Sequence, residues 1–263
     1  MVFHILATPP KNEPHTLDII AVHGLNGHYR DTWADKPGSS DATIWLADLL
    51  PKKLPGCRVM SYEYNASIKS MAVGEIDDVA RTMFGKLKDI RETSNIPIVF
   101  IAHSLGGIVI KQALALAEQS QYDFPGMTTH TKGIVFFGTP HRGANAADWA
   151  LMATKIGRSV LPRSHFRYLE ILKRNSEELY DVSEDFRHLA SRYAIVSFYE
   201  EHAYNRLWGK VIVDRDSALM GLQHEDYMML SGNHSSMCRF SKGDDERFDA
   251  VWRRIRRAAN GPV

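Results

Sequence analysis

Ser104 lies where an apolar run of strand length, residues 96–102, meets a helical pattern rich in Ala, Leu and Ile. A serine at the apex of a strand–turn–helix is held in a strained backbone conformation, so the residues beside it must be small. Ala102 and Gly106 are small, and Gly107 lets the helix pack close to the strand. The usual pattern has a glycine where Ala102 stands, a change that the turn tolerates. The spacing therefore predicts that Ser104 is a nucleophile at an elbow.

A second glycine-containing loop follows another buried-strand run and contains His23, Gly24 and Leu25. In α/β hydrolases, a loop after an early strand supplies one N–H of an oxyanion hole, and the residue after the nucleophile supplies the other. Two such donors stabilise the charge that develops on an acyl oxygen in the transition state. We therefore expect the oxyanion hole to consist of the Leu25 and Leu105 amides, with glycines that let the backbone approach the substrate.

A nucleophilic serine needs a base, and the chain order in this fold class is serine, acid, histidine. This order excludes every histidine before Ser104 and favours His234, which stands on a polar, glycine-containing loop ahead of the last helix. His224 and His202 are alternatives, since they also occur in predicted loops.

The acid that orients the histidine should follow a strand. Glu200 comes directly after the predicted strand 193–199, and Glu201 is next. Asp214, at the end of the predicted strand 210–214, is a rival whose alternative role is a turn cap. We favour Glu200 over Asp214, and both over Glu201.

Taken together, these motifs resemble one group of α/β hydrolases. The resemblance covers the chain from about Leu17 to Phe240 and depends on Val-His-Gly-Leu-Asn-Gly, Ala-His-Ser-Leu-Gly-Gly, Phe-Phe-Gly-Thr-Pro-His-Arg-Gly, Ser-Phe-Tyr-Glu and Asn-His-Ser-Ser-Met-Cys-Arg-Phe. The chain is similar to serine esterase/lipase domains related to GPI inositol-deacylase and to the "serine active site containing" mitochondrial protein. It resembles most the versions at the N-termini of fungal NOD-like receptors and NACHT proteins. The resemblance implies that Glu200 and His234 complete a catalytic triad, and that a receptor domain could follow in the native chain.

Bulk composition agrees with one globular α/β domain spanning residues 1–263. The chain has 263 residues, 44% of them hydrophobic, and a net charge of +1, which gives no indication of nucleic-acid binding. Cys57 and Cys238 have no metal-ligand spacing and form no disulfide framework. No signal peptide or transmembrane run is evident, so the sequence favours a cytoplasmic location with at most peripheral membrane contact.

Strands and helices alternate, which predicts a mostly parallel central sheet with helices on both faces. The predicted strands are 2–7, 17–22, 57–62, 96–102, 132–138, 193–199 and 210–214. An amphipathic pattern predicts a helix over 76–90. A last helix is expected over 244–257, with acidic residues at its start and a cluster of arginines at its end.

The insertion at residues 144–189 is expected to form a helical cap. It is apolar enough to roof an acyl-binding site, although helices that merely cover the sheet would have the same composition. It is also basic, which leaves a preference for anionic or phospholipid substrates open. His141 and Arg142, just before it, could line the pocket, and we assign His23, Gly24, His103 and His141 to substrate binding.

The sequence as a whole predicts a serine hydrolase that cleaves a carboxylic ester of an apolar, lipid-like acyl group. No cofactor and no metal are needed for that chemistry. Two alternatives remain: a signalling or effector module of a NOD-like receptor that keeps a hydrolase shell, and an acyltransferase that passes the acyl group to another alcohol.

Overall fold

The computed structural model describes residues 1–66, 73–141, 176–202 and 213–262. Within these residues, seven strands form one sheet in the order β1-β3-β2-β4-β5-β6-β7. The strands are β1 (Val2–Ala7), β2 (Leu17–Val22), β3 (Cys57–Glu63), β4 (Ile98–His103), β5 (Thr131–Phe137), β6 (Ala194–Glu200) and β7 (Asp226–Leu230). Among these seven described strands, only β1 runs antiparallel to its neighbour. The carboxyl ends of β2, β4, β5 and β6 therefore meet at one edge of the sheet, as a site built from strand-end loops requires.

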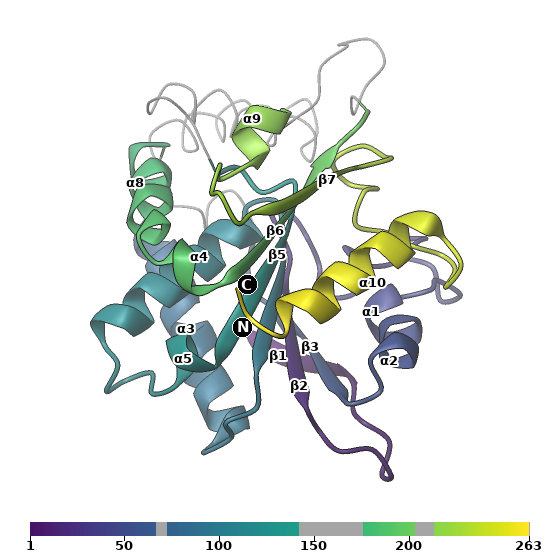
Figure 1. The fold of residues 1–263 in the computed structure, drawn as a ribbon, viewed down its shortest axis with the longest axis horizontal. Helices are drawn as coiled ribbons and strands as arrows, with labels where there is room; N and C mark the ends of the chain where they lie inside the picture. The colour runs from purple at the N-terminus through teal and green to yellow at the C-terminus, as the bar shows by residue number, and fades with distance from the viewer. Residues whose placement is uncertain (67–72, 142–175, 203–212, 263) are drawn as a thin grey trace.

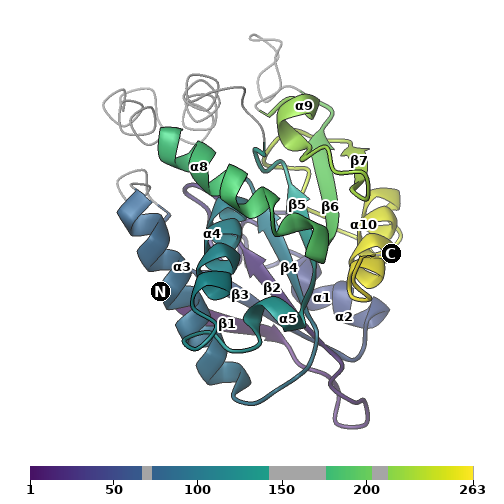
Figure 2. The same ribbon diagram turned by 60° about the vertical axis from the view of Figure 1, so that its left-hand side comes forward.

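Helices cover both faces of the sheet, as the alternating pattern predicted (Figures 1 and 2). One layer contains α3 (Val73–Arg91), α4 (Gly106–Gln119), α5 (Met127–His130) and α8 (Ser176–Arg187). The other contains α1 (Trp45–Asp48), α2 (Leu50–Lys53) and α10 (Glu246–Ala258). The short η2 (Ala190–Arg192) precedes β6, and α9 (Arg215–Ala218) lies beside β6 near the carboxyl edge.

The central strands are apolar on both sides because both sides are covered. Along β4, Phe100 belongs to the core under α3 and α4, where it stacks on Phe84 with ring centroids 5.9 Å apart. Its neighbour Ile101 faces the opposite core, which contains Trp45 and Phe248. Successive strand residues point to opposite faces, so one apolar run serves two cores.

The last helix, expected over 244–257, runs from Glu246 to Ala258 as α10. Asp245 is the N-cap of α10, and its side chain accepts the backbone N–H of Arg247 at 2.9 Å. A capped N-terminus satisfies donors that the helix itself leaves free. Phe248, Val251 and Ile255 form a buried stripe that packs the helix against β5 and β6.

The predicted strand at 210–214 is wrong where the structure describes it. Residues 210–212 lie outside the described residues, whereas Val213 and Asp214 belong to no strand. Asp214 instead caps α9, and its carboxylate accepts the Ser217 N–H at 2.9 Å. The edge position of the sheet belongs to β7, which the sequence pattern did not reveal because its residues are few and alternate between exposed and partly buried.

Most of the predicted cap, residues 144–175, lies outside the described residues. Residues 176–189 include α8, which packs along α4 in both views (Figures 1 and 2). At this contact the buried Lys111 amine donates to the Ser183 hydroxyl at 2.7 Å.

Among the described helices, none combines the length and the apolar character needed to cross a membrane.

Candidate active site

Ser104 follows the last residue of β4 and lies two residues before the start of α4. Its φ is +54°, a left-handed value that is rare for a residue with a side chain and marks a strained turn. Hydrogen bonds hold the turn in that state: the Ser104 N–H donates to the Phe137 carbonyl at 2.9 Å, and the Thr139 hydroxyl donates to the Ser104 carbonyl at 2.9 Å. The strand–turn–helix that the sequence predicted around Ser104 is therefore present.

Glycines let three backbone segments meet at the elbow. A methyl group on Gly106 would lie 2.4 Å from the His23 carbonyl oxygen, and one on Gly107 would lie 2.3 Å from the Thr139 side chain. A methyl group on Gly24 would lie 2.7 Å from Ser104 Cβ. No side chain fits at these distances, so the loop after β2 packs directly against the elbow.

His234 reaches Ser104 from the loop after β7. Its Nε2 lies 2.9 Å from Ser104 Oγ, which is hydrogen-bonding distance. The loop has its own brace, since the Asn233 side-chain oxygen accepts the N–H groups of Ser235 at 3.1 Å and Ser236 at 3.0 Å. His202 and His224, the alternative bases, are exposed.

Glu200, the last residue of β6, lies on the far side of the His234 ring. Its Oε1 is 3.3 Å from His234 Nδ1 and also accepts the Val213 N–H at 2.8 Å. The side chains of His234 and Glu200 are only 1% and 0% exposed. Asp214 is occupied as a helix cap, and Glu201 is exposed beside His202. The structure thus brings Ser104, His234 and Glu200 into one buried chain of polar contacts.

The two amides predicted for an oxyanion hole belong to backbone segments that meet at Ser104: Leu105 follows it directly, and Leu25 follows Gly24, which packs against it. A methyl group on Gly24 would lie 3.3 Å from the Leu105 nitrogen, so the backbone leading to Leu25 passes alongside that amide. Leu25 is 5% exposed and Leu105 0% exposed. Within the described part of the chain, neither the Leu25 N–H nor the Leu105 N–H donates to a backbone carbonyl in a turn, loop or helix cap. Buried N–H groups are rarely left unpaired, so this arrangement is suited to a ligand oxygen.

The histidines predicted to bind substrate have different surroundings. His23 is fully buried, with Nδ1 3.0 Å from the Gly24 carbonyl oxygen, and His103 Nε2 lies 2.8 Å from the His234 carbonyl oxygen. His141 is buried, and its ring meets Phe136 edge-on at 4.5 Å. Burial lowers the pKa of His23 to about 4 and that of His103 to about 3, so both rings are neutral at pH 7. Arg142 lies outside the described residues.

Gly138 is part of the site, although the sequence motifs did not single it out. Its φ is +56°, and a methyl group on it would lie 3.0 Å from His234 Nδ1. A glycine directly after a buried strand, followed by Thr-Pro, was the available signal. The partner ring is far along the chain, and so the contact itself was not predictable.

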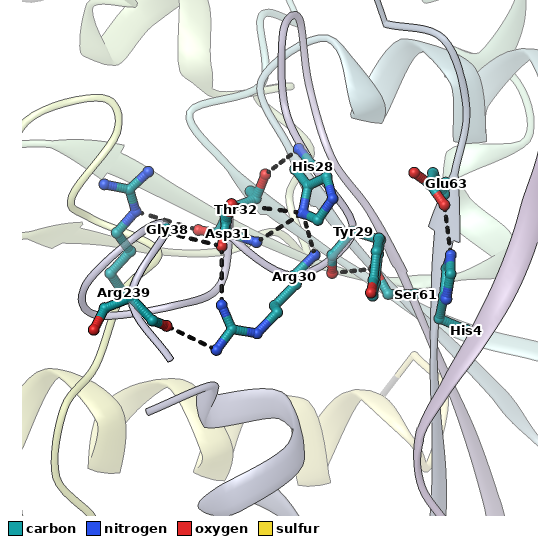
Figure 3. A network of polar contacts seen from close by, with 11 residues as sticks. His4, His28, Tyr29, Arg30, Asp31, Thr32, Gly38, Ser61, Glu63 and Arg239 are labelled. Atoms are coloured by element: carbon teal, nitrogen blue, oxygen red, sulfur yellow. Dashed lines mark hydrogen bonds and ion pairs between the residues drawn. The ribbon is translucent and has the colours of Figure 1, made fainter. Parts of the chain in front are cut away.

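The segment after the Gly24 loop is fixed to its surroundings by a polar network (Figure 3). The Ser61 hydroxyl donates to the Tyr29 carbonyl at 2.8 Å. The Thr32 hydroxyl accepts the His28 N–H at 3.1 Å, and the Thr32 carbonyl accepts the Arg239 Nε–H at 3.4 Å. Arg239 belongs to the loop that carries His234, so this network ties the two loops at the site to each other.

No cluster of three or more His, Cys, Asp or Glu side chains suited to a metal occurs among the residues that the structure describes.

Proteins named SERAC1 are similar to this chain in sequence. Protein SERAC1 of Bos taurus is 27% identical over 259 residues, which cover 89% of this chain and 38% of the bovine protein. Protein SERAC1 of Homo sapiens is 26% identical, with 94% of this chain and 40% of the human protein covered. The chain therefore spans about two fifths of the length of these curated relatives.

Solved structures of lipases share the fold at low identity. Lipase BlEst2 of Bacillus licheniformis superposes with a TM-score of 0.59 at 15% identity, over 95% of this chain and 96% of the lipase. A soluble variant of monoglyceride lipase from Saccharomyces cerevisiae gives a TM-score of 0.54 at 10% identity, over 98% and 90% of the two chains. These similarities confirm the predicted α/β-hydrolase fold.

Residues 11–157, more than half of the chain, match the family described as "Putative serine esterase (DUF676)". The match includes the Gly24 loop and the Ser104 elbow. The chain therefore belongs to this family and is a serine esterase/lipase-like α/β hydrolase.

Proposed function

We propose that the protein hydrolyses a carboxylic ester through an acyl-enzyme intermediate on Ser104. The observation that carries this proposal is the 2.9 Å contact between Ser104 Oγ and His234 Nε2, continued at 3.3 Å from His234 Nδ1 to Glu200. A hydroxyl, an imidazole and a carboxylate in this order form the arrangement that activates a serine.

In the first half of the reaction, Ser104 Oγ attacks the ester carbonyl while its proton moves to His234 Nε2. Glu200 accepts the His234 Nδ1–H, which fixes the tautomer and stabilises the imidazolium that forms. The Leu25 and Leu105 amides donate to the oxyanion. His234 then gives its proton to the leaving alcohol, and Ser104 keeps the acyl group.

In the second half, water replaces the alcohol. His234 takes a proton from water as its oxygen attacks the acyl carbonyl, and it returns that proton to Ser104 Oγ when the carboxylic acid leaves. Transfer to another alcohol would follow the same steps, and so the geometry is equally compatible with acyl transfer. Product analysis with added alcohol distinguishes the two reactions.

We further propose that the acyl group is apolar and that residues 144–189 cover it as a cap. The support is the apolar composition of that segment and the position of α8, which packs on the helix that begins beside the nucleophile. The superposed bacterial and yeast proteins are named as lipases, which agrees with an acyl ester substrate. The wider context, an effector domain of a fungal NOD-like receptor in the cytoplasm with peripheral membrane contact, stays a prediction.

Hydrolysis of p-nitrophenyl butyrate tests the proposal. We expect wild-type protein to release p-nitrophenol, with a burst equal to one acyl group per chain if deacylation is slow. Ser104→Ala and His234→Ala should abolish turnover, whereas Ser40→Ala, a change at an exposed serine far from the elbow in the chain, should not alter it. Folded wild-type protein with no esterase activity, or activity that survives Ser104→Ala, would overturn the proposal.

A further inference from the structure

Two histidines beside the site are bound to backbone carbonyls and not to a reacting group. His23 Nδ1 faces the Gly24 carbonyl at 3.0 Å, and His103 Nε2 faces the His234 carbonyl at 2.8 Å. We infer that His23 and His103 are positioning residues: His23 aims the Leu25 N–H of the oxyanion hole, and His103 holds the backbone of the base. This inference rests on the proposed function, because both residues act through groups that it assigns.

The case for His23 follows from the geometry of one peptide unit. The Gly24 carbonyl and the Leu25 N–H belong to the same peptide group, and in a trans peptide they point in opposite directions. The described chain contains no cis peptide bond. A donor that holds the Gly24 oxygen therefore turns the Leu25 N–H away from His23. Gly24 itself packs against Ser104, so the Gly24–Leu25 peptide group begins beside the serine.

The surroundings of His23 keep its ring in that position. The ring stacks on Tyr64 with centroids 4.6 Å apart and planes 12° apart, and the Tyr64 hydroxyl donates to the His23 carbonyl at 2.7 Å. The Gly27 N–H provides a second donor to the Gly24 carbonyl at 2.9 Å. Burial keeps the ring neutral, with its pKa lowered to about 4. A carbonyl can only accept, so the proton of the neutral ring is on Nδ1.

His103 acts on the loop that carries His234. It does so through Nε2, whereas His23 uses Nδ1. It directly precedes Ser104, and its Nε2–H donates to the carbonyl of His234, the residue whose ring faces Ser104. The two imidazole rings lie 5.0 Å apart. Burial and the neighbouring His234 lower the pKa of His103 to about 3, so His103 brings no second positive charge when the imidazolium of His234 forms.

The two positions differ in which ring nitrogen donates, and this difference supplies a sharp test. An asparagine amide nitrogen is as many bonds from Cβ as histidine Nδ1, and a glutamine amide nitrogen is as many bonds away as Nε2. Asparagine should therefore replace His23, and glutamine should replace His103. The reverse substitutions keep polarity but misplace the donor.

The experiment measures kcat and KM for p-nitrophenyl butyrate in the four variants. His23→Asn and His103→Gln should retain kcat within about threefold of wild type, whereas His23→Gln and His103→Asn should lose about tenfold or more. A misaimed oxyanion donor loses part of the ~10²-fold that such a donor contributes, and a displaced base loses rate because the reacting groups are no longer aligned. KM should change little, because these groups act in the transition state. Equal loss at one position for both amides would indicate a packing role, and equal retention would indicate no role. Either result overturns the inference.

A second measurement needs no variant. Long-range ¹H–¹⁵N correlation spectra of the wild-type histidine rings report the tautomer of each ring. We expect the Nδ1–H form for His23 and the Nε2–H form for His103, and the opposite form at either position contradicts the inference. These spectra do not depend on activity, so an inactive wild-type protein would refute the proposed function while leaving the tautomers to be read separately.

Discussion

Replacing Gly138 with alanine perturbs the site at one defined point. The new methyl group would lie 3.0 Å from His234 Nδ1 and 3.1 Å from Cε1, closer than ordinary van der Waals contact, which begins at 3.4 Å. The ring or the turn must therefore move by about 0.4 Å. Because the Nδ1 atom faces Glu200 and the opposite nitrogen faces Ser104, that movement disturbs both contacts of the ring.

The expected effects on stability and on activity can be separated. A left-handed φ costs a residue with a side chain about 1–2 kcal/mol, and in a domain of this size that lowers Tm by roughly 2–8 °C. Misplacement of a catalytic group by 1 Å can cost about 10²-fold in rate. On that scale, a displacement of about 0.4 Å lowers kcat roughly five- to tenfold.

Two other glycines provide matched controls. Gly38 has a φ of +78°, and a methyl group placed on it would meet nothing within 4 Å, so Gly38→Ala introduces the backbone strain without the clash. Gly243→Ala introduces neither. The assay compares Tm and kcat for p-nitrophenyl butyrate across the three variants. If Gly138→Ala retains the kcat of Gly38→Ala while both are folded, the His234 ring does not lie where the reasoning requires.

Three further outcomes follow from the buried polar groups. Glu200→Gln should lower kcat for p-nitrophenyl butyrate by about 10³-fold or more, whereas Asp214→Asn should be close to neutral, because Asn and Asp cap helices equally well; similar losses in both would contradict the assignment of the acid. Arg91→Met leaves the buried Asp18 carboxylate without one of its partners and should lower the free energy of urea unfolding by about 3–5 kcal/mol. Arg81→Met, at an exposed ion pair, should lower it by less than about 1 kcal/mol. A larger loss for Arg81→Met than for Arg91→Met would count against a buried network. Burial lowers the pKa of Lys111 from 10.5 to about 7, so the unfolded chain binds more protons than the folded one between these values and stability rises with pH there. Lys111→Met should lack this rise, of up to about 1.4 kcal/mol per pH unit, in urea unfolding at pH 7, 8 and 9. Parallel curves of unfolding free energy against pH for wild type and variant would refute it.

The strand–turn–helix around Ser104 was predictable because its signals are local. The apolar run before Ser104 forms β4, and the small residues at 102, 106 and 107 are those that the packed turn requires. The loop at Gly24 was predictable for the same reason, since a buried strand followed by glycines allows the backbone a close approach.

The acid could not be decided from the sequence. Glu200 and Asp214 both follow apolar runs, and short-range pattern does not distinguish a strand end at the sheet edge from a helix cap. The structure distinguishes them, since β6 is hydrogen-bonded between β5 and β7, whereas Asp214 begins α9. Long-range contacts such as that of Gly138 with His234 depend on how the strands are ordered, which periodicity does not report.

The most direct test of the central claim is the site of covalent labelling by a fluorophosphonate. We expect peptide mass spectrometry to find one adduct, on Ser104, that forms much more slowly in His234→Ala. A folded wild-type protein that takes up no label, or that carries it on a different residue, would contradict the account.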